Sequence, residues 1–412
     1  MRNKRIVIEN LPVTDYAAEG KAIGRLNGKV IFVEAVVPGD VVDVLITKNK
    51  KDWAQGKAIS FKEYSKDRVE PFCMHFGICG GCKWQMLPYQ KQLIYKQQEV
   101  EENLKRISKV ELPEILPIIG ADKTVYYRNK LEFTFSNKRY LLPHELEDLL
   151  PKDKNEITAE RPDFGGALGY HVSGIFDKII DIQECYLMDE VNNLIRNTIR
   201  HFAITNNLSY YDIKKHTGWL RNIIIRYSSL GQLMVNLVVG YEDKSSLKNI
   251  ADHLLQKVPS INTFLYTINA KWNDSIIDLE PQLYYGSGFI VEHLEDFQFK
   301  ISAKSFFQTN TKQAEKLYNV ARSFAQLTGK EIVYDLYCGT GSIGIFLSKG
   351  AKKIIGVEVN QQAIEDAKEN ALHNKITHAT FFTGDVIAIC NDEFFAVHGL
   401  PDVIITDPPR AG

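Results

Sequence analysis

The stretch EIVYDLYCGTGSIGIFLSKGAKKIIGVEVN, residues 331–360, decides the fold of the C-terminal part of the chain. It reads as a strand, a glycine-rich turn, a helix, a second strand and an acid, the order of an α/β unit with a parallel sheet. The turn contains G-x-G-x-x-G at Gly339, Gly341 and Gly344, so a dinucleotide is one candidate ligand. Glu358, at the end of the second strand, is placed to bind ribose hydroxyls with either kind of cofactor.

Acidic residues favour S-adenosylmethionine over a nicotinamide dinucleotide at this turn. Asp335 precedes the glycines, and Asp385 in FFTGDV and Asp407 in VIITDPP lie at later strand ends. Carboxylates close to a pyrophosphate would repel it, whereas they suit adenine, ribose and the ammonium group of the methyl donor. The sequence therefore predicts a Rossmann-like methyltransferase domain over residues 301–412.

Composition sets the limits on the rest of the chain. Its 412 residues are 44% hydrophobic, which is enough for two to four domains with real cores. No window approaches the run of about 18 apolar residues that a membrane span needs, so we expect a cytoplasmic protein with no membrane partner. Lys and Arg number 50 and Asp and Glu 51. Any nucleic-acid surface must therefore be local.

The first sixty residues read as five short strands separated by the turn signals AEG, NGK, PGD and KNKKDWAQG. Five strands in so short a span indicate a small closed barrel of the OB kind over residues 1–62. Such barrels often present a face to oligonucleotides.

Three cysteines follow in PFCMHFGICGGCKWQ, where Cys73, Cys79 and Cys82 have the spacing C-x5-C-x2-C. Disulfides are disfavoured in the cytosol, so three thiols this close indicate a metal site. Cys185, in IIDIQECYLMDE, is the best candidate for a fourth ligand. Four thiolates suit either zinc or a [4Fe-4S] cluster, and the spacing alone does not separate the two. A full thiolate shell favours a structural role.

The middle of the chain, residues 63–300, reads as a mixed α+β domain. Helical spacing over residues 88–109 predicts a long helix leaving the cysteine motif, with the connection to the methyltransferase domain running to residue 118. Strand-like runs alternate with turns after residue 120, and helices are expected near residues 188–204 and 244–257. The acidic run LPHELEDLLPKDKNEITAERPDF is predicted to be a surface insertion turned away from any polyanion.

Taken together, the motifs resemble one family, the RNA (uracil-5-)-methyltransferases that carry an N-terminal TRAM domain and a [4Fe-4S] cluster. The resemblance is closest to the branch that modifies 23S ribosomal RNA. It runs from about residue 10 to residue 412 and rests on RVEPFCMHFGICGGCKWQMLPYQKQL, YRNKLEFTFS, LGYHVSGIFDKIIDIQEC, AKSFFQTNTKQAEKLY, DLYCGTGSIGIFL and DPPRAG. The resemblance implies an RNA-binding monomer.

The resemblance also implies functional residues, and it selects iron over zinc for the four cysteines. The cofactor contacts that it implies are Gln308, Tyr337, Ser342, Glu358, Asp385 and Asp407. For RNA contacts it implies Arg128 in YRNK, Phe306 in SFFQTN and Arg410 in DPPRAG. Plain core packing is the alternative role for Phe306.

Methylation of uracil at carbon 5 needs a cysteine that adds to carbon 6, because carbon 5 is a poor nucleophile, and a base that later removes the carbon 5 proton. In the family both residues follow DPPRAG. Cys338 lies in the cofactor loop and Cys390 in a connecting segment, so neither takes the nucleophile's place. We therefore expect a C-terminally truncated, inactive chain whose methyltransferase domain is incomplete.

Three alternatives stay open at this point. The substrate is transfer RNA in relatives of similar layout. An amino methyltransferase would also place an acid before Pro-Pro, but an aromatic residue usually follows there, where this chain has Arg410. The third alternative is an RNA-binding protein without catalysis that holds a metal on four cysteines.

Overall fold

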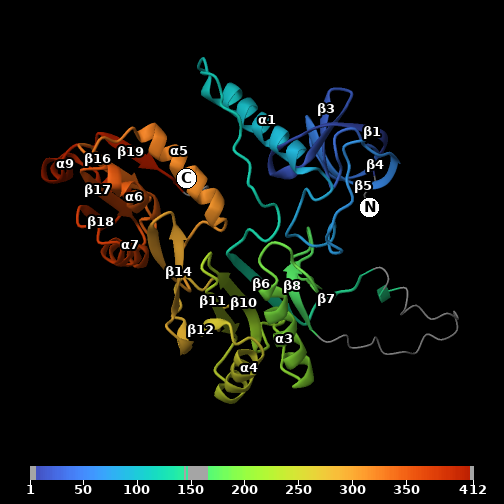
Figure 1. Ribbon diagram of the computed structural model, residues 1–412. Coiled ribbons are helices and arrows are strands. Elements are labelled where there is room, and N and C mark those ends of the chain that lie inside the picture. Colours follow the sequence, from blue (N-terminus) through green and yellow to red (C-terminus); the bar gives the residue numbers. More distant parts are fainter. Residues whose placement is uncertain (1–5, 143–144, 147–165, 409–412) are drawn as a thin grey trace. The chain divides into compact units, whose positions relative to one another are not determined.

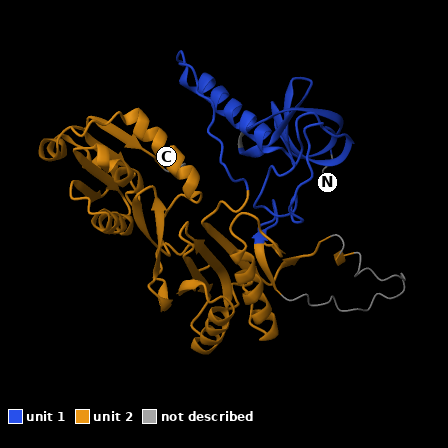
Figure 2. Ribbon diagram, viewed as in Figure 1, with its two compact units in different colours: residues 1–124, 170–176 blue, residues 125–169, 177–412 orange. Residues whose placement is uncertain are grey.

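The structure is a computed structural model that describes residues 6–142, 145–146 and 166–408. Contacts divide the chain into two compact units (Figure 2). Unit 1 comprises residues 1–124 and 170–176, and unit 2 comprises residues 125–169 and 177–412. The domain boundaries expected after residues 62 and 300 stay a prediction.

Unit 1 begins with a closed five-stranded barrel in the order β1-β2-β3-β5-β4 (Figure 1). The strands are β1 (Val7–Tyr16), β2 (Ala22–Leu26), β3 (Lys29–Glu34), β4 (Val41–Asn49) and β5 (Trp53–Glu63), and a 3-10 turn, η1 (Ala18–Gly20), joins the first two. Apolar side chains alternate inward, and those of Leu11, Ile31 and Val44 are fully buried. The predicted barrel is confirmed.

Helix α1 (Tyr89–Ser108) follows the cysteine loop. It ends where Lys109 adopts a left-handed φ of 53°. Pro113 and Pro117 then keep the chain non-helical to residue 118, because proline cannot continue a helix and disfavours helical backbone before it. The helix predicted over residues 88–109 is thus present as α1, whereas the connecting segment up to residue 118 is not helical.

Unit 2 contains an eight-stranded mixed sheet in the order β13-β12-β11-β10-β6-β8-β9-β7. Helices α3 (Val191–Thr205) and α4 (Lys244–Lys257) lie where helices were expected and pack side by side against this sheet (Figure 1). Strands β10 and β11 are buried along their length, and β11, α4 and β12 form a parallel crossover unit. The strands are β6 (Lys130–Ser136), β7 (Arg139–Tyr140), β8 (Ala167–His171), β9 (Ile179–Asp181), β10 (Leu220–Tyr227), β11 (Leu233–Val239), β12 (Ile261–Ile268) and β13 (Gln282–Gly286). Most of the acidic run, residues 147–165, lies outside the described residues.

The C-terminal part of unit 2 is the predicted α/β unit, with a parallel sheet in the order β18-β17-β16-β19. A hairpin of β14 (Phe289–Leu294) and β15 (Phe297–Ser302) packs with α5, α6 and α7 in one core, and α8 and α9 cover the other face. The remaining elements are α5 (Thr311–Ala325), β16 (Ile332–Leu336), α6 (Ser342–Leu347), η2 (Ser348–Gly350), β17 (Lys353–Glu358), α7 (Gln361–His373), β18 (Ala379–Thr383), α8 (Val386–Ile389), α9 (Asp392–His398) and β19 (Val403–Thr406).

Candidate methyl-donor site

The glycine loop joins β16 to α6 through backbone conformations and close contacts that favour glycine. Gly341 has a φ of 74°, and a Cβ there would lie 2.9 Å from the Phe381 ring. A Cβ on Gly344 would lie 3.0 Å from Asp335 Oδ2, so glycine lets α6 approach the sheet closely. Tyr337 also has a positive φ, 63°, although it is not glycine. Such strain is common at functional sites.

Carboxylates gather at the carboxyl ends of the parallel strands, where ligands of α/β sheets bind. Glu358 accepts hydrogen bonds from the backbone N–H groups of Gly339 (3.2 Å) and Asn360 (2.9 Å), so it is fixed beside the glycine loop. Asp335 is 1% exposed and accepts from the Gly344 N–H at 2.8 Å. Burial, together with the charges of Asp407 and Glu358, raises the pKa of Asp335 to about 7. The negative field at this edge suits a cationic ligand.

The two cysteines of this region do not suit nucleophilic chemistry. Cys338 is 6% exposed, and burial together with the nearby carboxylates of Asp335 and Glu358 raises the pKa of its thiol. Cys390 follows α8 on the other face of the sheet, and burial raises its pKa too. Both thiols stay protonated near neutral pH. Cys390 lies directly after the last residue of α8 (Val386–Ile389) and is not itself helical.

The loop of residues 303–310, here called the QTN loop, touches the glycine loop. Thr340 donates a hydrogen bond from its hydroxyl to the Phe306 carbonyl oxygen at 3.4 Å. The Phe306 side chain is 68% exposed, so core packing is the wrong role for it, and Phe307 is the buried neighbour at 5%. Gln308 is half-buried, and its carbonyl oxygen accepts from the Asn129 side chain at 2.9 Å.

Asn129 lies in the YRNK motif, but the sequence alone did not predict a role for it. It anchors the segment before β6 to the QTN loop, through its backbone N–H to Thr309 O (2.8 Å) and its side chain to Gln308 O and the Thr311 hydroxyl. Arg128, next to it, donates from its backbone to Leu187 O and from Nε to Lys130 O. The YRNK and SFFQTN motifs are therefore joined in space.

Two of the expected cofactor residues make local bonds. Ser342 is hydrogen-bonded through its hydroxyl to the Tyr318 hydroxyl at 3.0 Å. Asp385 caps α8, because its Oδ1 accepts from the backbone N–H groups of Ile387 (2.9 Å) and Ala388 (3.2 Å). Asp407 is exposed just after β19, whereas Arg410 lies outside the described residues.

Comparison with known proteins identifies the family of the chain. A family model described as tRNA (Uracil-5-)-methyltransferase matches residues 241–396, and a TRAM domain model matches residues 8–59. An "Uncharacterized RNA methyltransferase" of Bacteroides thetaiotaomicron is 48% identical over 399 residues, covering 96% of this chain and 86% of the relative. The chain belongs to the RNA (uracil-5-)-methyltransferase family.

Other members of this RNA methyltransferase family agree. The Chlorobaculum tepidum protein named "Uncharacterized RNA methyltransferase CT0009" is 39% identical over 418 residues, which cover all of this chain and 84% of the relative. The crystal structure of Pyrococcus abyssi tRNA (uracil-54, C5)-methyltransferase in complex with S-adenosyl-L-homocysteine has a TM-score of 0.69 and 25% identity, covering 100% of this chain and 85% of that one. RNA methyltransferase is therefore the enzyme class of this chain.

The cysteine loop of this methyltransferase lies in unit 1. Cys79 donates from its backbone N–H to His75 O at 2.9 Å, and the Gly81 N–H donates to the Cys79 Sγ at 3.4 Å. Gly80 is fixed by its N–H bond to His171 O at 3.0 Å. Cysteine sulfurs and N–H···S bonds suit an iron–sulfur centre, which takes four thiolate ligands, and this loop contains three cysteines.

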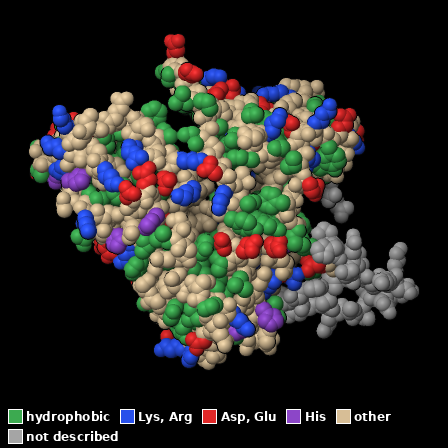
Figure 3. All heavy atoms as spheres, in the orientation of Figure 1, with side chains coloured by type: hydrophobic (Ala, Val, Ile, Leu, Met, Phe, Trp, Pro, Cys, Tyr) green, Lys and Arg blue, Asp and Glu red, His purple; other side chains and the backbone are tan. Residues whose placement is uncertain are grey.

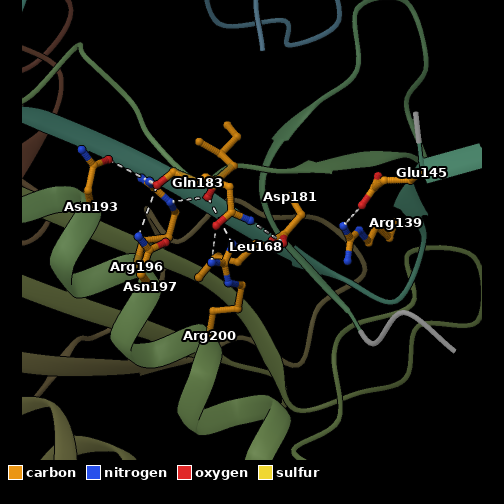
Figure 4. Close-up of polar contacts among 10 residues, drawn as sticks. Arg139, Glu145, Leu168, Asp181, Gln183, Asn193, Arg196, Asn197 and Arg200 are labelled. Carbon is orange, nitrogen blue, oxygen red and sulfur yellow. Dashed lines mark hydrogen bonds and ion pairs between the residues drawn. The ribbon is translucent and has the colours of Figure 1, made fainter. Parts of the chain in front are cut away.

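Cys185 belongs to unit 2. It lies two residues after Gln183, which is hydrogen-bonded to Arg196 of α3 (Figure 4). The guanidinium of Arg196, fully buried, donates to Ile182 O (3.0 Å), Gln183 O (2.8 Å) and Asn193 Oδ1 (2.8 Å). Asn193 Oδ1 accepts in turn from the Cys185 N–H at 2.8 Å. The Cys185 backbone is thereby fixed.

In the described part of the chain, no group of three or more His, Cys, Asp or Glu side chains is placed to hold a metal ion. The donor chemistry of the cysteines fits a cluster, but the cluster itself stays a prediction. Among the described helices, none is both long and apolar enough to cross a membrane.

Proposed function

We propose that this protein uses S-adenosylmethionine to form 5-methyluridine in RNA, and that its substrate is 23S ribosomal RNA. The observation that supports the proposal is the contact between the glycine loop and the QTN loop, in which Phe306 is exposed. The carboxylates of Asp335, Glu358 and Asp407 lie beside the glycine loop. When bound, the cofactor supplies the methyl group from a positively charged sulfonium. The carboxylates of the chain favour that charge, and Glu358 is positioned by two backbone hydrogen bonds to take the ribose.

Arg128 and Phe306 are the proposed RNA contacts of the described residues, with Arg410 outside them. An exposed phenylalanine beside the cofactor loop suits stacking on a base that has left its helix, which reaction at carbon 5 requires. The nucleophile of the reaction is neither Cys338 nor Cys390, because burial keeps both thiols protonated. The addition, methyl-transfer and proton-removal steps stay a prediction.

Calorimetric titration with S-adenosylhomocysteine tests the cofactor without requiring turnover. We expect binding to the wild-type chain and loss of binding on Glu358→Ala, and no binding to the wild-type chain would overturn the proposal. Mass spectrometry of RNA incubated with methyl-labelled cofactor tests the base, and 5-methyluridine formed by this chain would contradict the inactivity expected from its sequence. Label on adenine or guanine would contradict a uracil methyltransferase.

Transfer RNA is the second candidate substrate, because the matching family model and the Pyrococcus abyssi protein are both named for tRNA. Competition binding separates the two, with transcripts of 23S RNA fragments set against a tRNA transcript at one salt concentration. Tighter binding of a 23S fragment is the expected result. Tighter binding of tRNA would overturn the ribosomal substrate.

We further propose a [4Fe-4S] cluster on Cys73, Cys79, Cys82 and Cys185, in a monomeric cytoplasmic protein. Its support is the set of three thiols in one loop and the N–H···S bond to Cys79. Iron and acid-labile sulfide should be present in anaerobically purified protein and fall on Cys82→Ser, whereas Cys390→Ser should leave both unchanged. Zinc in place of iron on elemental analysis would overturn the cluster.

A further inference from the structure

Unit 2 holds an exposed tryptophan on the turn of residues 269–274, here called the tryptophan turn, which follows β12. Trp272 is 77% exposed, although its ring is large and apolar. Its ring stacks on that of His216, with centroids 4.9 Å apart and planes 8° from parallel. His216 itself has a left-handed φ of 54°, and its Nδ1 lies 3.3 Å from the Tyr211 hydroxyl. The side chains of Trp272, His216 and Tyr211, from two segments, thus form one aromatic cluster, here called the ledge.

Buried polar groups hold the tryptophan turn in place. Arg221, at 1% exposure, donates to Asn269 O (2.7 Å), Asn273 O (2.9 Å) and the Asp274 carboxylate (2.9 Å), and also to Lys271 O. The fully buried Asn269 adds a bond from Nδ2 to Asn273 O at 2.9 Å. A buried guanidinium is costly to desolvate, so these contacts fix the turn firmly. An exposed aromatic on a fixed support is the arrangement of a preorganised binding residue.

A cavity of about 220 Å³ lies beside this ledge. Its lining includes Tyr211, His216, Gly218, Arg221, Tyr241 and Asn269. The Arg221 guanidinium lies 4.0 Å from the Tyr211 ring centroid, and its buried Nε has no hydrogen-bond partner among the described residues. The cavity is at the carboxyl ends of the parallel strands β11 and β12, the usual place for ligands on such sheets. It is smaller than the roughly 300–1,000 Å³ pockets of drug-sized ligands, so it suits one flat ring system.

We propose that this pocket binds a single unpaired nucleobase of the substrate RNA, which stacks on the His216 ring that lines the pocket. Trp272 does not line the pocket, and its ring supports the imidazole of His216 by stacking on it. The proposal rests on the RNA substrate of the proposed function and adds a second RNA subsite to it. Stacking on aromatic rings and guanidinium planes is how proteins read unpaired RNA bases.

The pocket is separate from the methyl-donor site. Arg226, five residues after Arg221 on the same strand, donates to Ala303 O at 3.3 Å and to Ser305 O at 2.5 Å in the QTN loop. Five residues of strand span about 17 Å. The base held in this pocket is therefore not the base that is methylated. It belongs to a different nucleotide of the same RNA.

Charge makes a small contribution here. Lys138, Lys214 and Lys271 near the pocket each form an ion pair, with Asp212, Asp177 and Asp278. On the face drawn in Figure 3, Lys and Arg lie among Asp and Glu rather than in one basic stripe. Attraction to phosphate is then weak at this pocket, so stacking must supply most of its affinity.

The test is RNA binding by Trp272→Ala and Trp272→Phe variants of the whole chain, with oligouridine and a blunt RNA duplex as probes. Loss of one stacked base should weaken oligouridine binding by about 10-fold in Trp272→Ala. Trp272→Phe should retain most of the affinity. The loss should be the same at low and high salt, because no phosphate contact is removed. Duplex binding should not change, since paired bases are already stacked.

Controls separate this subsite from the family function. S-adenosylhomocysteine binding by Trp272→Ala should equal that of the wild type, and Phe324→Ala, which removes an aromatic of 73% exposure on α5, should bind oligouridine normally. Undiminished oligouridine binding by Trp272→Ala would overturn the subsite alone. Failure of the wild-type chain to bind any RNA would instead overturn the RNA function. Photo-cross-linking of 4-thiouridine oligomers should label the peptides that contain Trp272 or His216, and labelling confined to other peptides would contradict the subsite.

Discussion

The side-chain amide of Asn129 donates hydrogen bonds of 2.9 Å to the carbonyl oxygen of Gln308 and to the hydroxyl of Thr311. The Thr311 hydroxyl donates onward to Glu292 Oε2 at 2.8 Å, and Glu292 is 2% exposed. A partly buried chain of polar groups thus runs from the segment before β6, which carries Arg128, to the loop that carries the expected cofactor contact Gln308. This chain of hydrogen bonds holds the QTN loop at Gln308.

Asn129→Ala should weaken S-adenosylhomocysteine binding about 10-fold and lower the free energy of unfolding by about 1–2 kcal/mol, because buried acceptors lose their donor. Asn129→Asp should do no better, since a carboxylate would face carbonyl oxygens. Calorimetry and urea unfolding measure the two effects. Asn206→Ala is the matched control, because its side chain caps an exposed helix end with one bond to Phe202 O. Equal cofactor affinity in the Asn129 and Asn206 variants would show that the anchor does not position the loop.

Glu358→Gln tests the carboxylate beside the glycine loop. Glutamine keeps an oxygen acceptor for one of the two backbone N–H groups that bind Glu358, but it loses the charge and a second acceptor. We expect cofactor affinity to fall by 10- to 100-fold, which is about 1.4–2.7 kcal/mol, with a smaller change in stability. Glu365→Gln on α7, whose side chain accepts one exposed bond from Gln361, is the control. Calorimetry that finds both variants alike would rule out the ribose role.

Asp385 needs a test that separates capping from cofactor contact. Both of its backbone bonds end on Oδ1. Serine is an equally good N-cap, so Asp385→Ser should keep the stability of the chain, whereas Asp385→Ala should lose about 1 kcal/mol. If the carboxylate contacts the cofactor, as we propose, the serine variant loses affinity several-fold at unchanged melting temperature. An affinity equal to that of the wild type would leave Asp385 a helix cap only.

Asp335 should make the stability of the protein depend on pH. Its folded-state pKa is about 7 because of burial, against an ordinary value of 3.8 in the unfolded chain. Between these values the folded state binds more protons than the unfolded state, so stability falls as pH rises from about 4 to about 7 and levels off above. The slope approaches about 1.4 kcal/mol per pH unit at full linkage. Asp335→Asn should reduce this slope in urea unfolding across that window, and an unchanged slope would contradict the raised pKa.

Local patterns predicted the elements and site residues that depend on neighbours in the sequence. The alternation of the barrel strands, the glycine loop and the acids after strands could be read directly, since period and strand ends are local features. Asn129 could not be selected in this way. Its partner Gln308 is 179 positions away, and nothing in YRNK distinguishes an anchor from a solvent-facing amide. Phe306 and Phe307 are adjacent and identical in type, and only the fold shows which is exposed.

The Cys185 loop offers the last test, because one buried guanidinium, that of Arg196, supplies two of the hydrogen bonds to its backbone. Arg196→Met removes the donors to Ile182 O, Gln183 O and Asn193 Oδ1 while keeping an apolar stem of similar length. Stability in urea should fall by about 3 kcal/mol, since buried acceptors lose a charged donor, and amide exchange in residues 182–188 should accelerate. Lysine should not rescue, because a single ammonium group cannot reproduce the fork of guanidinium bonds. The control is Arg106→Met, whose guanidinium is largely exposed on α1 and pairs with Glu102, so its cost should stay within about 0.5 kcal/mol. If the two methionine variants unfold at the same urea concentration, the α3 network does not hold this loop, and the fixed backbone of Cys185 must have another cause.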